Sequence, residues 1–429
     1  MQSFSSAADR ILGGNLALTV GLLLVGLLAL RLVIWCASVL QGLYYSGRRE
    51  RLELKRLRNQ LELLERQTRD AEQKSFAWNG YRKFKVARKV SECEGVCSFY
   101  LEPHDRKPLP TYLPGQFLTF QLQVPGQSKP VVRCYSLSDC ASEAIHYRVT
   151  IKKVVKPDTS CGIASAYFCD QVKEGDLLDV KAPSGKFTLD PSGAAPVVLI
   201  SGGVGLTPML SMVNAIIRLN KKREVWFFYG ARNGSEHIQR QYLTRLADEH
   251  RNVRMQICYS RPAPEERAGR DFQHAERISI ELLKKVLPTN QYEYYICGPP
   301  EMMKAVPEGL MEWGVPRENI FTESFGPATI KAAVVPATTA PSNEPAVKIT
   351  FAKSQKAVAW DSGAATLWDL ADRHGITIPK GCGCGDCGSC EVAIRSGSIE
   401  HVKTPTAAVA DGSCLSCICR PKTDLVVDA

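Results

Sequence analysis

The residues of this chain best suited to chemistry are cysteines gathered near its C-terminus. Cys382, Cys387 and Cys390 lie in the stretch GCGCGDCGSC, with four residues between the first two and two between the last two. A more distant cysteine follows in the stretch LSCICRP at residues 415–421. Thiolates at this C-x4-C-x2-C…C spacing hold the two irons of a plant-type [2Fe–2S] cluster, and the glycines let the backbone aim its N–H groups at the sulfur atoms. The pattern predicts transfer of single electrons, and its regular spacing disfavours disulfides or scattered buried thiols.

The fourth ligand is assigned by a resemblance. The stretch LSCICRP is similar to the end of plant-type and bacterial oxygenase-associated ferredoxins. This resemblance implies that Cys417 is the fourth ligand, and it leaves Cys384, Cys414 and Cys419 as free thiols without an assigned role. No Cys-x-His pair occurs in the sequence, so a Rieske centre with two histidine ligands is disfavoured.

An uncharged run near the N-terminus is long enough to cross a membrane. Residues 11–30 contain no charged residue, and about twenty apolar residues in a helix span the hydrocarbon core of a bilayer. Arg31 follows, and a second apolar stretch extends to residue 40. We expect the span to end near residue 30, because a charge in the bilayer interior costs several kcal/mol whereas one at the edge snorkels to the interface. An end near residue 40 and a cleaved signal peptide are the alternatives.

Charges beside this run predict its orientation. Six lysines and arginines follow it between residues 48 and 58, whereas one arginine beside an aspartate precedes it. The positive-inside rule therefore predicts that the large C-terminal part lies in the cytoplasm. We expect a single-pass protein of a bacterial-type inner membrane. Of the sixteen cysteines, those outside the cluster segment are dispersed, which fits a reducing compartment. The net charge of +10 is modest for 429 residues, so no nucleic-acid binding is expected.

Between the membrane segment, residues 1–47, and the first globular domain, residues 48–76 predict a helical stalk. Four leucines follow the 3-4-3 spacing of a coiled-coil seam: Leu54, Leu57, Leu61 and Leu64. Only about two heptads are available. A dimer formed through residues 51–66 and a solvated single helix therefore both remain open.

Residues 77–192 alternate apolar and polar residues between frequent turns and predict an antiparallel β-barrel. Strands are expected near residues 84–90, 117–124 and 145–153. The stretch RCYSLSD at residues 133–139 lies between these strands. Arg133 can neutralise a pyrophosphate, Tyr135 can cover an isoalloxazine ring, and Ser136 can hydrogen-bond near its N5 atom. This set of side chains predicts a flavin site.

The motifs along residues 78–327 resemble the ferredoxin–NADP reductase superfamily, and most closely the reductase module of bacterial flavohaemoglobins. The stretches that carry the resemblance here are PGQF at 114–117, R-x-Y-S at 133–136, GIAS at 162–165 and VKAPSGKF at 180–187. The resemblance implies that Gly162, Ala164 and Ser165 hold the flavin phosphates at a helix start, where backbone N–H groups favour anions. It also favours FAD over FMN.

An apolar strand, a glycine-rich turn and a helix follow one another in the stretch VVLISGGVGLTPM at residues 197–209. Such turns bring the backbone close to phosphate, which the helix dipole then faces. The candidate contacts are Gly202, Gly203, Gly205, Thr207 and Pro208. The stretch departs from G-x-G-x-x-G, so a purely structural turn is the alternative. Further strands near 225–230, 254–259 and 292–297 predict a parallel sheet across residues 193–327, with its ligand at the carboxyl ends of the strands.

Positions at these strand ends are assigned by the same resemblance. It places Arg232, Ser260 and Arg261 at the adenosine half of the dinucleotide, Cys297 and Gly298 at the nicotinamide, and Glu323 and Phe325 near the flavin. Ser136, Cys297 and Glu323 would then orient donor and flavin while hydride passes directly between the two rings. Arg261 can accept the 2′-phosphate of NADPH, but the flavohaemoglobin-like character favours NADH.

The sequence of the C-terminal part predicts a linker followed by a small domain. Residues 328–346 are rich in alanine, proline and threonine and predict a flexible linker. A hairpin near 347–360 and a helix near 366–374 then precede the cysteine loop, in the order of a β-grasp ferredoxin domain over residues 347–429. The fold class predicted for the chain is multidomain α+β: a transmembrane helix, an antiparallel flavin barrel, a parallel-sheet nucleotide domain and a ferredoxin domain.

Together these parts predict one path for electrons. A nicotinamide gives two electrons as a hydride whereas a [2Fe–2S] cluster accepts one at a time, so a flavin is needed between them. We expect a membrane-anchored NAD(P)H reductase that serves an oxygenase, hydroxylase or desaturase. One alternative is an electron-input subunit of the sodium-pumping NADH:quinone type, in which the ferredoxin domain precedes the reductase. The other is a redox sensor, against which the intact nicotinamide site argues.

Overall fold

The computed structural model describes most of the chain beyond the stalk. The described residues are 20–39, 41, 53, 57, 78–140, 145–155, 161–219, 222–325, 347–361, 363–378, 382–385, 388–403, 405, 407 and 409–429. The expected linker and Cys387 lie outside them, as does the expected stalk apart from residues 53 and 57, which are helical. The chain divides into two compact units, Met1–Ser75 and Phe76–Ala429.

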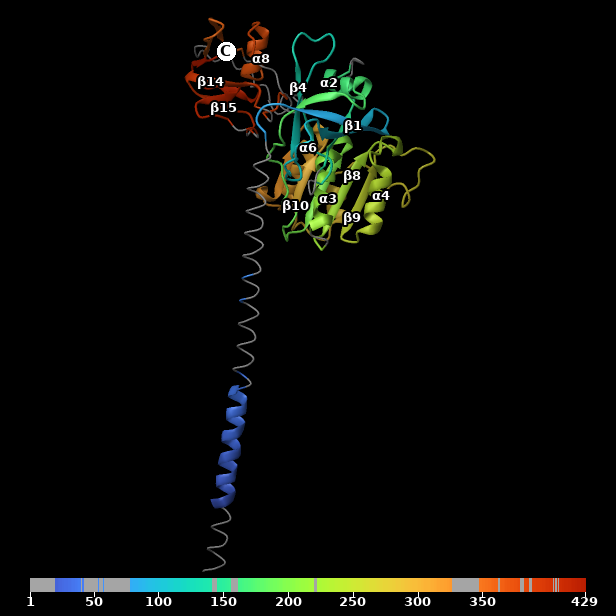
Figure 1. Ribbon diagram of the computed structural model, residues 1–429, viewed down its shortest axis with the longest axis vertical. Coiled ribbons are helices and arrows are strands. Elements are labelled where there is room, and N and C mark those ends of the chain that lie inside the picture. Colours follow the sequence, from blue (N-terminus) through green and yellow to red (C-terminus); the bar gives the residue numbers. More distant parts are fainter. Residues whose placement is uncertain are drawn as a thin grey trace, which may run out of the picture. The chain divides into compact units, whose positions relative to one another are not determined.

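The first unit contains a helix at Val20–Val39 with a mean hydropathy of 2.4 and no buried residue (Figure 1, blue). Its length and composition suit a membrane span, and a signal sequence near the N-terminus passes the same test. The helix runs through Arg31 to a point close to residue 40, the alternative end of the span. Arginine is a good helix former, so the charge does not interrupt the helix; the first part of the expected span, residues 11–19, lies outside the described residues.

The second unit begins with the antiparallel sheet expected for the flavin domain. Its six strands have the order β4-β3-β6-β1-β2-β5. Their bounds are β1 Arg82–Cys93, β2 Val96–Pro103, β3 Phe117–Leu122, β4 Val131–Ser136, β5 Tyr147–Lys152 and β6 Leu177–Val180. The short helix α2, Ile163–Ala166, and the π-helical turn η1, Tyr167–Gln171, follow β5. Phe84, Phe99 and Phe120 of the strands and Phe168 of η1 are fully buried in this core. Strands β3 and β5 are buried along nearly their whole length.

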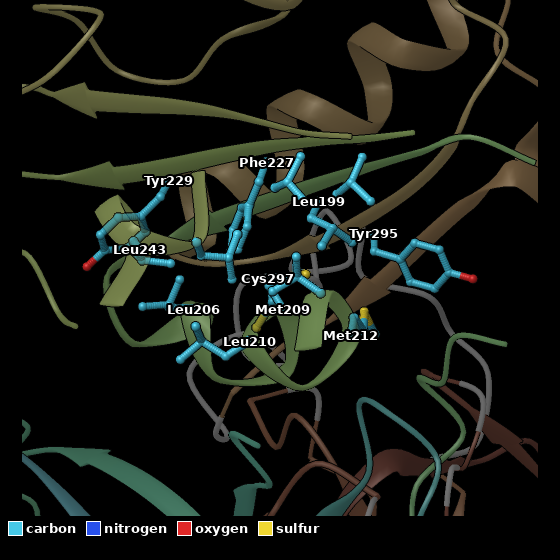
Figure 2. Packing of buried hydrophobic residues seen from close by; sticks show 14 of the residues in the cluster. Leu199, Leu206, Met209, Leu210, Met212, Phe227, Tyr229, Leu243, Tyr295 and Cys297 are labelled. Atoms are coloured by element: carbon cyan, nitrogen blue, oxygen red, sulfur yellow. The ribbon is translucent and has the colours of Figure 1, made fainter. Parts of the chain in front are cut away.

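A five-stranded parallel sheet follows, as expected, with the order β11-β10-β7-β8-β9. Its strands are β7 Val197–Gly202, β8 Val225–Ala231, β9 Val253–Tyr259, β10 Glu293–Cys297 and β11 Ile320–Glu323. The helical elements are η2 Gly203–Gly205, α3 Leu206–Leu219, η3 Gly234–Glu236, α4 Arg240–Glu249, α5 Ile280–Val286, α6 Pro300–Glu312 and η4 Arg317–Asn319 (Figure 1, green to orange). Figure 2 shows Leu206, Met209 and Leu210 of α3 packed beneath Leu199 and Phe227 of the sheet. This apolar contact fixes the start of α3 against the carboxyl end of β7.

The C-terminal part has the β-grasp order expected for a ferredoxin domain. Its strands are β12 Lys348–Phe351, β13 Lys356–Ala359, β14 Glu391–Ser396, β15 Ile399–His401, β16 Ser413–Leu415, β17 Cys419–Pro421 and β18 Leu425–Val427. Helix α8, Leu367–Arg373, is capped by the Thr366 side chain, which accepts from Asp369 N. The sheet order is β13-β12-β18-β14-β16, with β12 and β18 parallel. The cysteine loop between α8 and β14 and the turn η5, Ser416–Ile418, bring the distant cysteines together.

Candidate flavin, nucleotide and iron–sulfur sites

The expected flavin residues lie on β4, which pairs with β3. Ser136 lies opposite Phe117 in the register, and Arg133 lies opposite Phe120. The ring of Tyr135 packs edge-on against Phe120 and Phe168, with centroids 5.8 and 5.2 Å apart. Burial raises the pKa of Tyr135 well above its ordinary value, so its hydroxyl stays neutral. The strand thus presents one cation, one aromatic ring and one hydroxyl beside the core of the flavin domain.

The three residues expected to orient hydride transfer are brought together. Ser136 Oγ donates a hydrogen bond of 3.3 Å to Glu323 Oε2 at the carboxyl end of β11. Cys297, at the carboxyl end of β10, is the register partner of Glu323 and is fully buried (Figure 2). Burial, and to a smaller extent the carboxylate of Glu323, raises the pKa of the Cys297 thiol well above its ordinary value. Cys297 is therefore a neutral thiol at physiological pH, suited to contact an uncharged ring and unsuited to act as a base.

Two glycines shape the turn beside Cys297. A Cβ added to Gly205 would collide with the carbonyl oxygen of Cys297, whereas one added to Gly298 would meet the terminal methyl group of Met302. At Gly205, therefore, only a residue without a side chain lets the glycine turn approach the end of β10 this closely. Thr207 donates its hydroxyl to Val204 O at 3.1 Å and, like Pro208, is buried at the start of α3.

The loop expected to hold the flavin phosphates is built by local hydrogen bonds. Ser165 Oγ donates to Gly162 O at 3.1 Å and accepts from the backbone N–H of Val154 at 3.1 Å. Ala164 is buried. The hydroxyl of Ser165 thus holds the loop against the end of β5.

A cavity of about 570 Å³ opens at the carboxyl ends of β7, β8, β9 and β10. Of the residues expected to contact the dinucleotide, Gly202, Gly203, Arg232 and Ser260 line it. The other expected contacts are not among its lining residues: Gly205, Thr207, Pro208, Arg261, Cys297 and Gly298. Several residues that line the cavity were not predicted from the sequence, including Lys152, Glu236, Glu276 and Arg277. Lys152 belongs to the flavin-domain strand β5, so only the folded chain places it here.

The described cluster cysteines converge in the ferredoxin domain. Cys382, Cys390 and Cys417 are buried, and the sulfur atoms of the last two lie 3.1 Å apart. The backbone N–H of Cys384 donates to Cys382 Sγ at 3.5 Å, which is the kind of N–H···S contact that tunes a cluster. Soft sulfur donors on a glycine-rich loop fit a [2Fe–2S] cluster, which Cys387, outside the described residues, would complete.

The remaining thiols of this domain lie close to the same loop. Cys414 and Cys419 are fully buried, with their sulfur atoms 3.6 Å apart. Cys384 is also buried, and its carbonyl accepts a hydrogen bond of 3.1 Å from Lys403 Nζ. All three occupy core positions.

A second, smaller cavity of about 60 Å³ joins the flavin residues to the cluster loop. Its lining comes from β3 and β4, from the end of β11 and from the cysteine loop: Phe117, Arg133, Cys134, Ser136, Glu323, Ser324, Phe325, Cys382 and Cys384. Phe325 remains partly exposed. Two further contacts join the domains here, a 3.2 Å hydrogen bond from Lys186 Nζ to Pro405 O and the packing of Cys134 against the ferredoxin core.

Family models match these three parts in chain order. The oxidoreductase FAD-binding domain matches residues 83–189, the oxidoreductase NAD-binding domain matches 199–308, and the 2Fe-2S iron-sulfur cluster binding domain matches 349–422. The chain belongs to the ferredoxin–NADP reductase superfamily. Its matched domains are an FAD-binding domain, an NAD-binding domain and a [2Fe–2S] domain, which confirms the expected cofactors FAD, NAD(P)H and [2Fe–2S].

Known relatives of this reductase include bacterial flavohaemoproteins. The flavohaemoprotein of Bacillus cereus is 40% identical over 259 residues, which cover 60% of this chain and 64% of that protein. The chain thus spans less than two thirds of that relative. The flavohaem-like FAD/NAD-binding domain of nitric oxide dioxygenase from Vibrio cholerae is 31% identical, with a TM-score of 0.51, and the match covers 58% of this chain and 100% of that one.

A further solved structure is similar to most of this chain. Phthalate dioxygenase reductase, described as a modular structure for electron transfer from pyridine nucleotides to [2Fe–2S], is 25% identical with a TM-score of 0.50. The match covers 82% of this chain and 98% of that one. The similarity therefore includes the ferredoxin domain as well as the two reductase domains.

Proposed function

We propose that the protein takes hydride from NADH onto FAD and delivers single electrons through its [2Fe–2S] cluster to a separate acceptor protein. The observation that carries this proposal is the small cavity that Arg133, Ser136 and Glu323 share with Cys382 and Cys384. When bound, the flavin divides a two-electron donation into single-electron steps. A flavin held by β4 and a cluster held by the cysteine loop would meet at this cavity.

The residues of the chain then have separate tasks. Arg133 would neutralise flavin phosphate, and Tyr135 would cover one face of its ring. Ser136 and Glu323, joined by their hydrogen bond, would fix the reacting edge of the flavin against the nicotinamide. Buried Cys297 would exclude water from the nicotinamide, which protects the hydride from side reactions.

The dinucleotide would lie across the carboxyl ends of the parallel strands, as ligands do in this class of sheet. Gly202, Gly203 and Gly205 would allow close approach of the pyrophosphate, and Thr207 and Pro208 would hold the start of α3 in place. Arg232, Ser260 and Arg261 would lie toward the adenosine, and Gly298 and Phe325 toward the nicotinamide and the flavin.

The acceptor that we propose is an oxygenase, hydroxylase or desaturase. The similarity to phthalate dioxygenase reductase, with its three domains in common, supports an oxygenase-type partner. Because Cys382 and Cys384 of the cluster loop line a cavity with the flavin residues, the ferredoxin domain would turn away from β4 to present this loop to an acceptor. Residues 328–346 would supply the tether for that movement.

We further propose that the helix Val20–Val39 anchors the enzyme to a bacterial-type inner membrane with its catalytic part in the cytoplasm. The basic residues that follow the helix support this orientation. A membrane-bound acceptor would benefit, because confinement of both proteins to one surface raises their effective concentration. A dimer formed through residues 51–66 would carry two sets of reductase sites.

A ligand substitution tests the assigned order of electron transfer. Cys417→Ser should abolish NADH-dependent reduction of cytochrome c, a protein acceptor, and leave reduction of ferricyanide, which can reach the flavin directly. Cys414→Ala, at another buried cysteine of the same domain, should keep both activities. Equal loss of both activities in Cys417→Ser, with flavin content unchanged, would contradict the proposed path.

A further inference from the structure

The two ends of the large cavity can be told apart from the strand order. In the proposed function, Cys297 and Glu323, which do not line this cavity, would hold the nicotinamide beyond its β10 side, next to the flavin residues. The glycine turn after β7 would then hold the pyrophosphate in the middle. Because β8 and β9 lie on the opposite side of β7, the adenosine ribose must reach their carboxyl ends, where Arg232 and Ser260 line the cavity.

Glu236 holds both cations at that end of the cavity. Its carboxylate lies 3.2 Å from Lys152 Nζ and 3.1 Å from Arg232 Nη1. Lys152 comes from β5 of the flavin domain, whereas Glu236 and Arg232 follow β8 of the nucleotide domain. The three charges therefore form a network across the domain boundary, at the place where a 2′-phosphate on the ribose would lie.

The turn that carries Glu236 is built to hold it there. Asn233 Oδ1 accepts from Ser235 N at 3.1 Å, and Glu236 N donates to Asn233 O at 3.2 Å. Tyr229 donates its hydroxyl to Glu236 O at 3.4 Å. The Glu236 side chain is only 25% exposed. At this exposure solvent screens the Glu236 carboxylate only in part, so its charge can act on a ligand bound in the cavity.

The other charges that line the cavity also disfavour the binding of an additional phosphate. The cations are Lys152, Arg232 and Arg277, and the carboxylates are Glu236, Glu276, Glu281 and Glu301. Arg277 is itself paired with Glu301 at 3.0 Å. Each lining cation thus already has a carboxylate partner, and the lining carries no excess of positive charge. A doubly negative phosphate would have to displace one of these carboxylates or lie beside it.

We propose that Glu236 sets the nucleotide preference of this reductase, by holding Lys152 and Arg232 and repelling the 2′-phosphate of NADPH. NADH carries a ribose hydroxyl at that position, and this hydroxyl can donate a hydrogen bond to a carboxylate. The inference rests on the proposed binding of the dinucleotide in this cavity. Arg261, which follows β9, donates its backbone N–H to Arg232 O at 2.8 Å but is not among the residues that line the cavity.

Binding of the oxidised nucleotides NAD+ and NADP+ to the full-length FAD-loaded protein tests this inference without turnover. Wild-type protein should bind NAD+ more tightly. Glu236→Gln, which keeps shape and removes charge, should lower the ratio of the NADP+ and NAD+ dissociation constants by about tenfold, as expected for one charge beside a phosphate in a partly screened site. The change should shrink at high salt, since screening weakens charge interactions.

Two further variants make the result specific. Glu301→Gln removes an equal charge from the β10 side of the cavity, where it pairs with Arg277, and should leave the ratio within about twofold of wild type. In an Arg232→Ala background, Glu236→Gln should have a smaller effect, because residues in one network are not additive. An unchanged ratio in Glu236→Gln, or an equal shift in Glu301→Gln, would overturn the inference while leaving the proposed function intact. Failure of wild-type protein to bind either nucleotide would instead contradict the proposed function.

Discussion

Ser136 on β4 and Glu323 at the end of β11 are joined by a 3.3 Å hydrogen bond, although 187 residues separate them in the sequence. The pair links the flavin domain to the nucleotide domain, as the Lys152–Glu236 ion pair does elsewhere along the same boundary. In the proposed function it lies where the two cofactors would meet, so it would help to set the relative placement of the two rings.

Removal of the Ser136 hydroxyl should slow flavin reduction more than it weakens nucleotide binding. We expect Ser136→Ala to reduce the rate of FAD reduction by NADH about 10- to 100-fold, because loss of positioning in hydride transfer raises the barrier, with little change in the Kd for NADH. Stopped-flow absorbance of the flavin at several NADH concentrations measures both quantities. Ser192→Ala, at an exposed turn beside Asp190, is the control and should match wild type; a raised Kd with an unchanged limiting rate in Ser136→Ala would show that the hydroxyl serves binding alone.

Gly205 should tolerate no side chain. The Cβ of Gly205→Ala would meet the carbonyl of Cys297, so the loop after β10 must move away from the flavin residues. We expect NADH-dependent flavin reduction to fall at least about 100-fold, as for a displaced reacting group, while dithionite still reduces the bound FAD. Anaerobic absorbance with each reductant provides the comparison. A variant that NADH reduces at the wild-type rate would show that the close approach is not needed.

Acid should destabilise the nucleotide domain through His237. Its Nδ1 lies 2.8 Å from the Tyr259 hydroxyl, its Nε2 has no hydrogen-bond partner among the described residues, and burial lowers its pKa from 6.5 to about 3. The unfolded chain therefore takes up a proton below pH 6.5 that the folded chain refuses, and stability falls as the pH falls toward 3. Between pH 6.5 and 5 the loss should be about 1.5 kcal/mol.

Chemical denaturation at several pH values measures that loss. His237→Gln should flatten the dependence in this interval, whereas His104→Gln, at an exposed histidine, should leave it unchanged. An identical pH dependence in wild type and His237→Gln would assign the acid sensitivity to other groups.

A bulky side chain in the small cavity should separate the two electron-transfer steps. Cys384→Phe would fill the space of about 60 Å³ between the flavin residues and the cluster loop and push the two apart. We expect FAD reduction by NADH to remain at the wild-type rate and subsequent cluster reduction to slow. Rapid-freeze EPR follows the cluster, and dithionite-reduced samples show whether the cluster is assembled. Cluster reduction at the wild-type rate would place the electron path elsewhere.

Much of this architecture could be predicted from the sequence because its signals are local. The alternation along 84–90 and 117–124 gave two strands of the antiparallel sheet, and the run into Gly202 and Gly203 gave the strand and turn that line the large cavity. Cysteine spacing predicted a ligand set of which two described members, Cys390 and Cys417, have sulfur atoms 3.1 Å apart.

Features that depend on contact between distant segments could not be predicted in this way. Lys152 ends an ordinary strand, and its partner Glu236 lies in a turn without a recognised motif; only the packing of two domains brings them together. The same holds for Cys134, which faces the ferredoxin core although it lies within the flavin motif. The end of the N-terminal helix was also not predictable from Arg31. The cost of a charge in a bilayer bears on where a membrane span ends, whereas the helix itself continues through Arg31 to Val39.

Anaerobic titration of the purified full-length protein with NADH, followed by absorbance and EPR, would show whether electrons pass from NADH through the flavin to the cluster. We expect the flavin to bleach and a reduced [2Fe–2S] signal to develop as further NADH is added, with NADPH much less effective at equal concentration. A fully bleached flavin beside a cluster that dithionite can reduce but NADH cannot would contradict the proposed path. The flavin residues and the cluster loop would then line one cavity without electron transfer from the flavin to the cluster.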